Sequence, residues 1–521
     1  MYGSPLFTII AHARSGALDH AWRLFREAGR LLKDQALAAR GDERQGFYRQ
    51  AAEAYGRAAA IDGAAYPLIN AATLALLAGD AAQAETRAHQ ALDRLAAAGP
   101  DADTPYYLAA TRAEALLLTG QVDQARRILR EAIALAPRAW EDHASTLRQF
   151  ALILDAKAES ALWLDALRPP RSLHFAGHMG LSENTVGLAA RVRAVLETER
   201  VGFGFGALAA GADIVIAEVL VEMGAELHLV LPAPAAVFRA ASVEPLGDGW
   251  GRRFDVLLAQ AETLRELGRP HDPPHPLGVR LAAEVAMGEA VMHARALASQ
   301  PLQLLVLDAA DQGDQKETGG SAWAGEAWCA TNLPQCILHE PRATPTPSGP
   351  APSPLVLAAV VLIAFSEGDT LAGATRLSQT VLPRLAEILA DGPAPLSPPT
   401  WRGESVQVAF ASPVDAARCA MRAASALNGL VTFQIAGAYD VAIRSAGPDG
   451  SILGPAATLP LEVLPLVPPG AILVSDLFAA AMQIGRWAEP GPRVEYVGDR
   501  PSSDLATPSR LFALKASPDA D

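Results

Sequence analysis

Three short glycine-rich loops have the composition needed to bind a phosphorylated ligand through backbone amides. The residues that form them are Gly177, His178 and Gly180, then Gly206, Gly211 and Asp213, then Gly319 and Gly320. Because glycine has no Cβ, a phosphate can approach the N–H groups at the start of a following helix. Glu218, shortly after the second loop, is a carboxylate that can accept a ribose hydroxyl. These residues are the predicted ligand-binding set; the alternative is that the glycines only make tight strand-to-helix turns.

A parallel sheet would bring these loops together. Apolar segments that read as strands begin at residues 172, 201, 226, 302 and 335, and helical patterns cover 185–198, 212–223 and 279–298. Strands that alternate with helices imply a parallel sheet covered on both faces, and such sheets bind ligands at the carboxyl ends of their strands. The sequence therefore predicts an α/β domain over 172–341, in which His174 is a core histidine of the first strand.

The region before this domain is predicted to be entirely helical. The segment 76–84 returns as 117–125, an offset of 41 residues, and in each copy a helix ends at glycine before a second helix begins. Hairpins of this kind must stack on neighbours to bury their apolar faces. The pattern over residues 1–168 resembles tetratricopeptide repeats, although their usual period is about 34 residues. The resemblance implies binding of partner proteins; the alternative is a helical domain that packs only on the rest of the chain.

A proline-rich segment, 342–354, is the clearest linker in the chain. A third domain is predicted beyond it, over 355–516. Its expected strands are 355–365, 406–410, 431–442, 471–475 and 511–514, and its expected helices are 377–389 and 414–427. The first strand is an unbroken apolar run, about half as long as a membrane-spanning helix, which favours a buried strand.

The third domain resembles the class III adenylate/guanylate cyclase homology domain. Four segments carry the resemblance, in the family's order: Phe365-Ser366-Glu367, Gly403-Glu404, Pro468-Pro469-Gly470-Ala471-Ile472-Leu473-Val474-Ser475 and Tyr496-Val497-Gly498. The resemblance implies an α+β, ferredoxin-like fold and a surface for forming a homodimer or a heterodimer.

The same resemblance points to a damaged active site. The family binds two metal ions with aspartates, and Glu367 and Glu404 stand in their places with one extra methylene each. Thr458 stands where the family has a ribose-orienting asparagine, and Glu462 where it has a transition-state arginine. An anion at that position repels phosphates. We therefore expect no catalytic residues here; the alternative is a divergent nucleotidyl cyclase that acts on ATP or GTP with a divalent metal at Glu367 and Glu404.

The α/β domain resembles the Rossmann-like sensor domains of bacterial signalling proteins. The resemblance rests on its strand-loop-glycine pattern and on the run from Gly211 to Glu218. It implies that this domain binds a nucleotide-derived ligand. A divalent metal is expected in addition only if the cyclase-like site is active. Nucleotide hydrolysis or NAD-type chemistry in this domain is a further alternative, for which the sequence supplies no clear nucleophile.

Composition limits the remaining possibilities. The 521 residues are 50% hydrophobic and 19% charged, which is typical of folded domains. The net charge of −14 disfavours binding to nucleic acid, and the three cysteines are too few for a disulfide framework. We expect a cytoplasmic signalling or scaffold protein without a membrane span, built from three domains.

Overall fold

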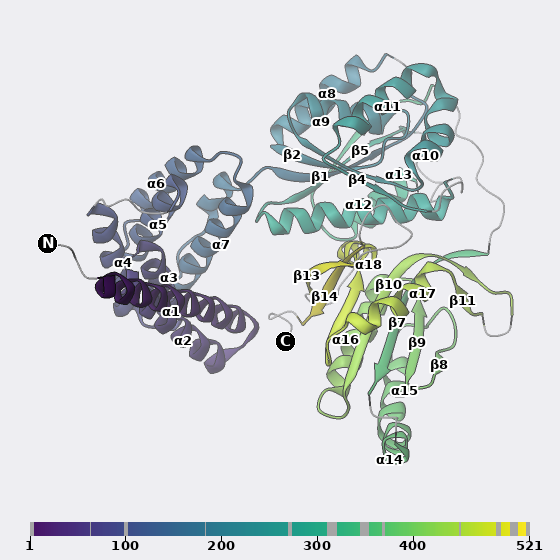
Figure 1. The fold of residues 1–521 in the computed structure, drawn as a ribbon. Helices are drawn as coiled ribbons and strands as arrows, with labels where there is room; N and C mark the ends of the chain where they lie inside the picture. Colours follow the sequence, from purple (N-terminus) through teal and green to yellow (C-terminus); the bar gives the residue numbers. More distant parts are fainter. Residues whose placement is uncertain are drawn as a thin grey trace. The chain divides into compact units, whose positions relative to one another are not determined.

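The computed structural model contains a helical N-terminal part, a parallel sheet and a mixed sheet, and it confirms this predicted succession (Figure 1). It describes residues 5–62, 64–97, 103–182, 184–268, 274–309, 320–343, 354–366, 370–447, 450–485, 491–500 and 509–516. The chain divides into two compact units. One comprises the residues up to Pro169 with Ala296–Ala298, and the other comprises Pro170–Arg295 and the residues from Ser299 onward. Both sheets therefore belong to the second unit.

The first unit is a series of helices. They are α1 (Pro5–Ala38), α2 (Gly41–Asp62), α3 (Ala65–Leu77), α4 (Ala81–Ala96), α5 (Pro105–Leu118), α6 (Val122–Leu135) and α7 (Trp140–Ala156), followed by a 3₁₀ segment, Leu162–Leu167. The hairpins α3–α4 and α5–α6 contain the two copies of the sequence repeat. In each, a glycine with positive φ, Gly79 or Gly120, lies between the helices. The two copies therefore have the same local structure, and helix begins earlier in the chain than residue 17, where the sequence pattern starts.

The parallel sheet has six strands in the order β4-β3-β2-β1-β5-β6. They are β1 (Arg171–Gly177), β2 (Val201–Gly206), β3 (Glu226–Leu231), β4 (Thr263–Glu266), β5 (Pro301–Leu307) and β6 (Gln335–His339). The associated helices are α8 (Val186–Thr198), α9 (Ala212–Glu222), α10 (Ala235–Ser242), α11 (Asp248–Gln260), α12 (Pro276–Ala296) and α13 (Ser321–Cys329). The strand order reverses between β1 and β5, the kind of point at which doubly wound sheets bind ligands. The sequence analysis missed β4, α10, α11 and α13, and it began α12 three residues late.

The two faces of this sheet differ in polarity. Leu173 and Phe175 of β1 face a hydrophobic core shared with α8, α9 and α11, which Figure 1 shows on one side of the sheet. Because side chains alternate along a strand, Ser172 and His174 point to the other face, where α12 and α13 lie. Both are almost completely buried. The second face thus carries polar groups that must be hydrogen-bonded.

The mixed sheet has the order β13-β14-β12-β10-β7-β9-β8, with β11 paired to β10. Its strands are β7 (Leu355–Phe365), β8 (Thr400–Arg402), β9 (Ser405–Phe410), β10 (Phe433–Arg444), β11 (Ile452–Leu453), β12 (Ile472–Ser475), β13 (Arg493–Arg500) and β14 (Ser509–Lys515). The β10–β12 pair is parallel, and the other pairs are antiparallel. The apolar run predicted as a strand is β7, which lies between β10 and β9 and is buried along most of its length.

The helices around this sheet require one correction. They are α14 (Leu371–Arg376), a π-helical turn (Leu377–Val381), α15 (Leu382–Ala390), α16 (Pro413–Leu427), α17 (Pro455–Val463) and α18 (Asp476–Ala481). The helix predicted over 377–389 therefore starts six residues earlier, at Leu371, and contains a π-helical turn. The sequence analysis also missed β11, β13, α17 and α18; the two helices and β11 are short and show too few periods to be recognised.

Helix α12 belongs to the packing of both sheets. Its residues Leu281 and Val285 lie in one hydrophobic core with Ala359 of β7 and Phe478 of α18. Gly288 is so close to α18 that a Cβ there would lie 1.9 Å from the Ala480 carbonyl oxygen. Close packing of this kind makes α12 a structural connection between the two sheets.

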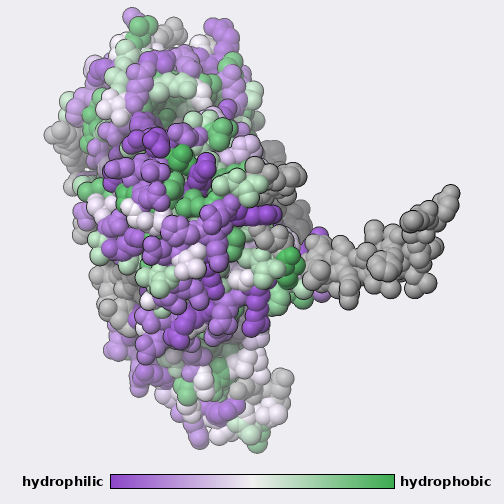
Figure 2. All heavy atoms as spheres, turned by 90° about the vertical axis from the view of Figure 1, so that its left-hand side faces the viewer, coloured by the Kyte–Doolittle hydropathy of each residue, from purple (hydrophilic) through white to green (hydrophobic). Residues whose placement is uncertain are grey.

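The surface shows no sign of a membrane-spanning helix. Among the described residues, no helix combines the length and apolar character needed to cross a bilayer. On the face drawn in Figure 2, hydrophilic and hydrophobic residues are interspersed.

Candidate functional site

A cavity of about 210 Å³ lies where β1, β2 and β3 end. Five residues of the predicted ligand-binding set line it: Gly177, His178, Gly206, Asp213 and Gly320. Most of the remaining wall is apolar and includes Phe175, Phe238 and, from α12, Val279, Ala282 and Ala286. The structure therefore gathers loops that are far apart in the sequence around one cavity.

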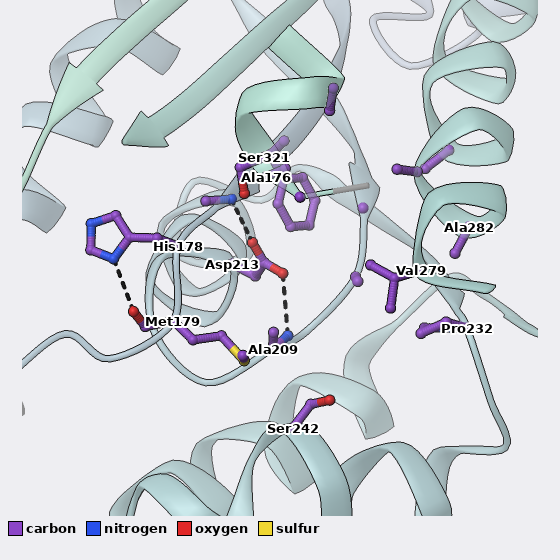
Figure 3. A pocket seen from close by; sticks show the side chains of 18 of the residues that line it. Ala176, His178, Met179, Ala209, Asp213, Pro232, Ser242, Val279, Ala282 and Ser321 are labelled. Carbon is purple, nitrogen blue, oxygen red and sulfur yellow. Dashed lines mark hydrogen bonds between the residues drawn. The ribbon is translucent and has the colours of Figure 1, made fainter. Parts of the chain in front are cut away.

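Asp213, at the start of α9, ties two of these loops together. Its Oδ1 accepts a hydrogen bond from the Gly177 N–H at 2.8 Å, and its Oδ2 accepts one from the Ala209 N–H at 3.2 Å (Figure 3). Complete burial raises the pKa of this carboxyl to about 7, although the two N–H donors favour the ionised form. Asp213 thus holds the exits of β1 and β2 together, and its carboxyl also faces the cavity.

We expect Asp213→Asn to flatten the pH dependence of stability between about pH 4 and 7. The folded-state pKa is raised above its ordinary value of 3.8, so the folded protein keeps a proton that the unfolded chain releases. Stability from this group is fully present below about pH 4 and falls as pH rises through 7, by at most about 1.4 kcal/mol per pH unit. Urea unfolding across this range measures the slope, with the exposed Asp391→Asn as the matched control. A variant that keeps the wild-type slope contradicts this account.

The glycines of the two loops have structural reasons to be glycine. A Cβ at Gly177 would lie 2.2 Å from the Cβ of Ala212, and one at Gly211 would lie 2.7 Å from the His178 carbonyl oxygen. Gly211 also has a φ of +127°, which other residues rarely adopt. The close contact between the loops therefore accounts for these glycines without a ligand, as the alternative prediction required. Gly180, also in the first loop, has a positive φ, and its carbonyl accepts a hydrogen bond from the Ala343 N–H.

His178 does not present a free imidazole to the cavity. Its Nε2 lies 2.7 Å from the Glu340 carbonyl oxygen and its Nδ1 lies 3.0 Å from the Met179 carbonyl oxygen. In Figure 3 its side chain points away from Val279 and Ala282. The ring therefore anchors the loop after β1.

Glu218 is not among the described residues that line the cavity. Glu218 of α9 makes a bidentate ion pair with Arg253 of α11. Its two carboxylate oxygens lie 2.6 Å from Arg253 Nε and 2.6 Å from Arg253 Nη2. This pairing occupies the carboxylate that was expected to bind a ribose hydroxyl. Gly319 lies outside the described residues, although its neighbour Gly320 lines the cavity.

The sequence analysis did not place His174 in the ligand site, yet it lines the cavity. As predicted, it is a buried histidine, and its ring stacks on Trp328 with centroids 6.1 Å apart. Burial lowers the pKa of His174 to about 3, so the ring is neutral near pH 7. The wall contributed by α12 was also missed, because an alanine-rich helix carries no motif.

The cyclase-like positions lie on the mixed sheet and its helix α17. The Phe365 N–H donates to the Glu404 carbonyl oxygen at 2.9 Å, so the β8–β9 turn lies beside the end of β7. Glu367, two residues after β7, lies outside the described residues. Within the described part of the chain, no cluster of three or more metal-binding side chains is present. The position of Glu404 is thus compatible with the predicted site, while its partner is not described.

Neither of the two predicted site residues on α17, Thr458 and Glu462, is a cation. Thr458 is exposed, and its hydroxyl lies 3.4 Å from the Gly454 and Pro455 carbonyl oxygens. Glu462 is exposed and forms an ion pair with Arg500 of β13, at 2.5 Å. Glu462, the residue expected in the place of the family's arginine, therefore has its charge balanced from another strand.

Among the known proteins compared with this chain, only solved structures are similar to it. No protein-family model matches the chain, and no curated protein matches it either. Similar solved structures include an adenylate/guanylate cyclase/hydrolase from Silicibacter pomeroyi (20% identity, 97% of that chain, TM-score 0.25). They also include the adenylyl cyclase CyaB from P. aeruginosa (12%, 94%, 0.26) and the guanylate cyclase domain of RhGC from Catenaria anguillulae in complex with GTP (9%, 97%, 0.25). Each of these three likenesses covers 31% of this chain.

Proposed function

We propose that this protein is a signalling or scaffold protein whose cyclase-like domain is catalytically inactive. The observation that carries the proposal is Glu462, which stands where the class III cyclases resembled by the sequence have a transition-state arginine. Loss of one electrostatic donor to a transition state typically costs about 3 kcal/mol, and an anion in its place repels the triphosphate as well. The ion pair to Arg500 supports this reading, because it gives Glu462 a structural partner.

The retained domain would serve assembly. Class III cyclases form their active sites between two such domains, so a domain without chemistry still offers a surface for a homodimer or heterodimer. Several large apolar side chains on this domain are exposed, among them Leu453, Leu461 and Trp401. The helical hairpins of the first unit, which resemble tetratricopeptide repeats, would bind partner proteins.

The parallel-sheet domain would act as a sensor for a nucleotide-derived ligand in the manner of the Rossmann-like sensors it resembles. Support comes from the cavity at the ends of β1, β2 and β3. Ala282 and Ala286 of α12 line this cavity and also belong to the core that α12 shares with the mixed sheet. A ligand that contacts these alanines touches a helix packed on the cyclase-like domain, and differential contact is what coupling between two sites requires.

The alternative function is a divergent nucleotidyl cyclase with a metal ion at Glu367 and Glu404. It is favoured by the hydrogen bond between the Phe365 N–H and the Glu404 carbonyl, which places the β8–β9 turn beside the end of β7. Glutamates retain the charge of the aspartates they replace. The alternative requires catalysis without a cation at position 462.

An activity assay separates the two proposals. We expect purified protein incubated with ATP or GTP and Mn²⁺ to form no cyclic nucleotide above the no-protein blank, because position 462 is an anion. Glu404→Ala should behave as the wild type does. Cyclic nucleotide formed by the wild type and lost in Glu404→Ala would establish the cyclase alternative.

A further inference from the structure

The hydrogen bonds around His174 determine which of its nitrogens carries a proton. Gln335 Nε2 donates to the Gly325 carbonyl oxygen at 3.0 Å and to Gln303 Oε1 at 2.6 Å. This identifies the oxygen end of the Gln303 amide. Its nitrogen donates to the Ala324 carbonyl oxygen at 3.2 Å and lies 3.0 Å from His174 Nδ1 and 3.6 Å from Met287 Sδ. An amide nitrogen can only donate, so Nδ1 accepts and the neutral ring carries its proton on Nε2.

This Nε2–H is available to a ligand. His174 lines the cavity, and among the described residues no side chain or carbonyl accepts a hydrogen bond from Nε2. The imidazole is neutral, so it offers a hydrogen-bond donor without a positive charge. An acceptor on a ligand in the cavity would gain a hydrogen bond from this N–H.

The size of the cavity limits what can enter it. Pockets for drug-sized ligands measure about 300–1,000 Å³, and an apolar cavity of about 150 Å³ holds benzene. At about 210 Å³ this cavity has room for one fused ring. Its apolar walls, formed by residues such as Phe238, Val279 and Ala286, fit the faces of a planar ring.

The described wall of the cavity carries one acidic and one basic side chain, Asp213 and Arg342. Asp213 presents a carboxyl, and burial of a phosphate beside it would be unfavourable. Arg342 is the one lysine or arginine among the described lining residues, and its Nη1 donates to the Met179 carbonyl oxygen at 3.3 Å. The cavity therefore favours an uncharged ligand group that can donate to Asp213 and accept from His174.

We propose that the cavity binds the uncharged heterocyclic base of a nucleoside, a purine-sized ring with a nitrogen acceptor for His174 Nε2–H and an amino donor for Asp213. Any phosphates of the ligand remain outside. This inference rests on the proposed ligand-sensing function and reverses the role expected for the glycine loops, which here surround the base. His174 is the residue that selects for an acceptor on the ring.

The test is isothermal titration of the full chain with adenine, adenosine, ATP and inorganic triphosphate. We expect adenine and adenosine to bind within about tenfold of ATP, and triphosphate not to bind. Binding of ATP or triphosphate without binding of adenine or adenosine overturns this inference but leaves ligand sensing intact. If none of the four binds, both this inference and the sensing of an adenine nucleotide fail.

Two variants make the result specific to the cavity. His174→Phe removes the donor and should weaken adenine binding about tenfold, the upper range for one hydrogen bond. Ala283→Leu fills the cavity and should abolish adenine binding without touching the hydrogen-bond network. Ala189→Leu, on α8 away from the cavity, is the matched control and should bind as the wild type does. Unchanged binding in both cavity variants, with folding verified by circular dichroism, would place the base elsewhere and overturn the inference.

Discussion

Gly288→Ala is expected to force α12 and α18 apart and to lower the free energy of unfolding of the second unit by about 1–3 kcal/mol. A Cβ at this position would lie 1.9 Å from the Ala480 carbonyl oxygen and 2.3 Å from its carbonyl carbon. Both atoms are backbone, so no side-chain rotation relieves the overlap. The clash must displace a helix that contributes Phe478 to the shared core.

The matched control for this substitution is Gly187→Ala in α8, where an added Cβ meets nothing within 4 Å. There, alanine should stabilise by about 0.5–1 kcal/mol, because it restricts the unfolded chain more than glycine does. Urea unfolding of both variants gives the comparison. Hydrogen exchange should also become faster in α18 and β12 of Gly288→Ala. Equal stability of the two variants would show that α12 and α18 are not in close contact.

Arg280→Ala is expected to destabilise the protein by about 3 kcal/mol at pH 8, because it leaves the buried Glu284 without its counter-charge. Glu284 Oε1 accepts from Arg280 Nε at 3.0 Å, and its Oε2 accepts from the Tyr439 hydroxyl at 2.6 Å. Removing one partner of a buried ion pair costs about 3–5 kcal/mol, and the lower end applies here because Arg280 itself is partly exposed. Arg280 also stacks on Trp323, 4.6 Å from the ring centroid.

The pH dependence of this effect identifies its cause. Burial raises the pKa of Glu284, while Arg280 and Tyr439 oppose the rise. A raised folded-state pKa means that stability is fully present below the ordinary value of 4.5 and is lost as pH rises through the folded-state pKa. Removing Arg280 raises this pKa further, so the deficit of Arg280→Ala should be large at pH 8 and should shrink as the pH is lowered toward 5.

Neutralising the carboxyl provides the control. The double variant Arg280→Ala with Glu284→Gln should recover most of the stability at pH 8, because no uncompensated charge remains. Urea unfolding at pH 5 and pH 8 measures both terms. A deficit that is the same at the two pH values, and that Glu284→Gln does not relieve, would mean that lost packing on Trp323 is responsible.

Both predictions concern the same structural connection. Glu284 and Gly288 lie on the part of α12 that packs on β10 and α18, and Ala282 and Ala286 belong to the cavity wall. Further ion pairs join the same elements: Arg265 of β4 contacts Glu289 of α12 and Asp476 of α18. Any change in the position of α12 would therefore act on the mixed sheet.

Long, regular elements could be predicted from the sequence because their cause is local. The apolar run Leu355–Phe365 and the segment Gln335–His339 are strands with the predicted bounds. The short strand β4 and the short helix α18 were missed because their residues show no periodicity of their own. Neighbouring strands and helices stabilise them instead.

The candidate site was predictable to the extent that topology alone placed its loops. Strands in a parallel sheet end at one edge, so Gly177, Gly206 and Asp213 were expected to meet, and they do. Glu218 was expected to join them, but Arg253 comes from a helix that the sequence analysis missed and holds the carboxylate elsewhere. The contribution of His174 depended on Gln303, a residue 129 positions away.

By itself, the sequence determined the helical hairpins and the alternating strands and helices, because each follows from residues close together in the chain. The tertiary structure alone decided that Arg500 balances Glu462, that Gln303 directs the proton of His174, and that α12 lies between the cavity and the mixed sheet. The physical reason is that these contacts join residues far apart in the chain, and buried polar groups take whichever partner the packing of whole elements brings within hydrogen-bond distance.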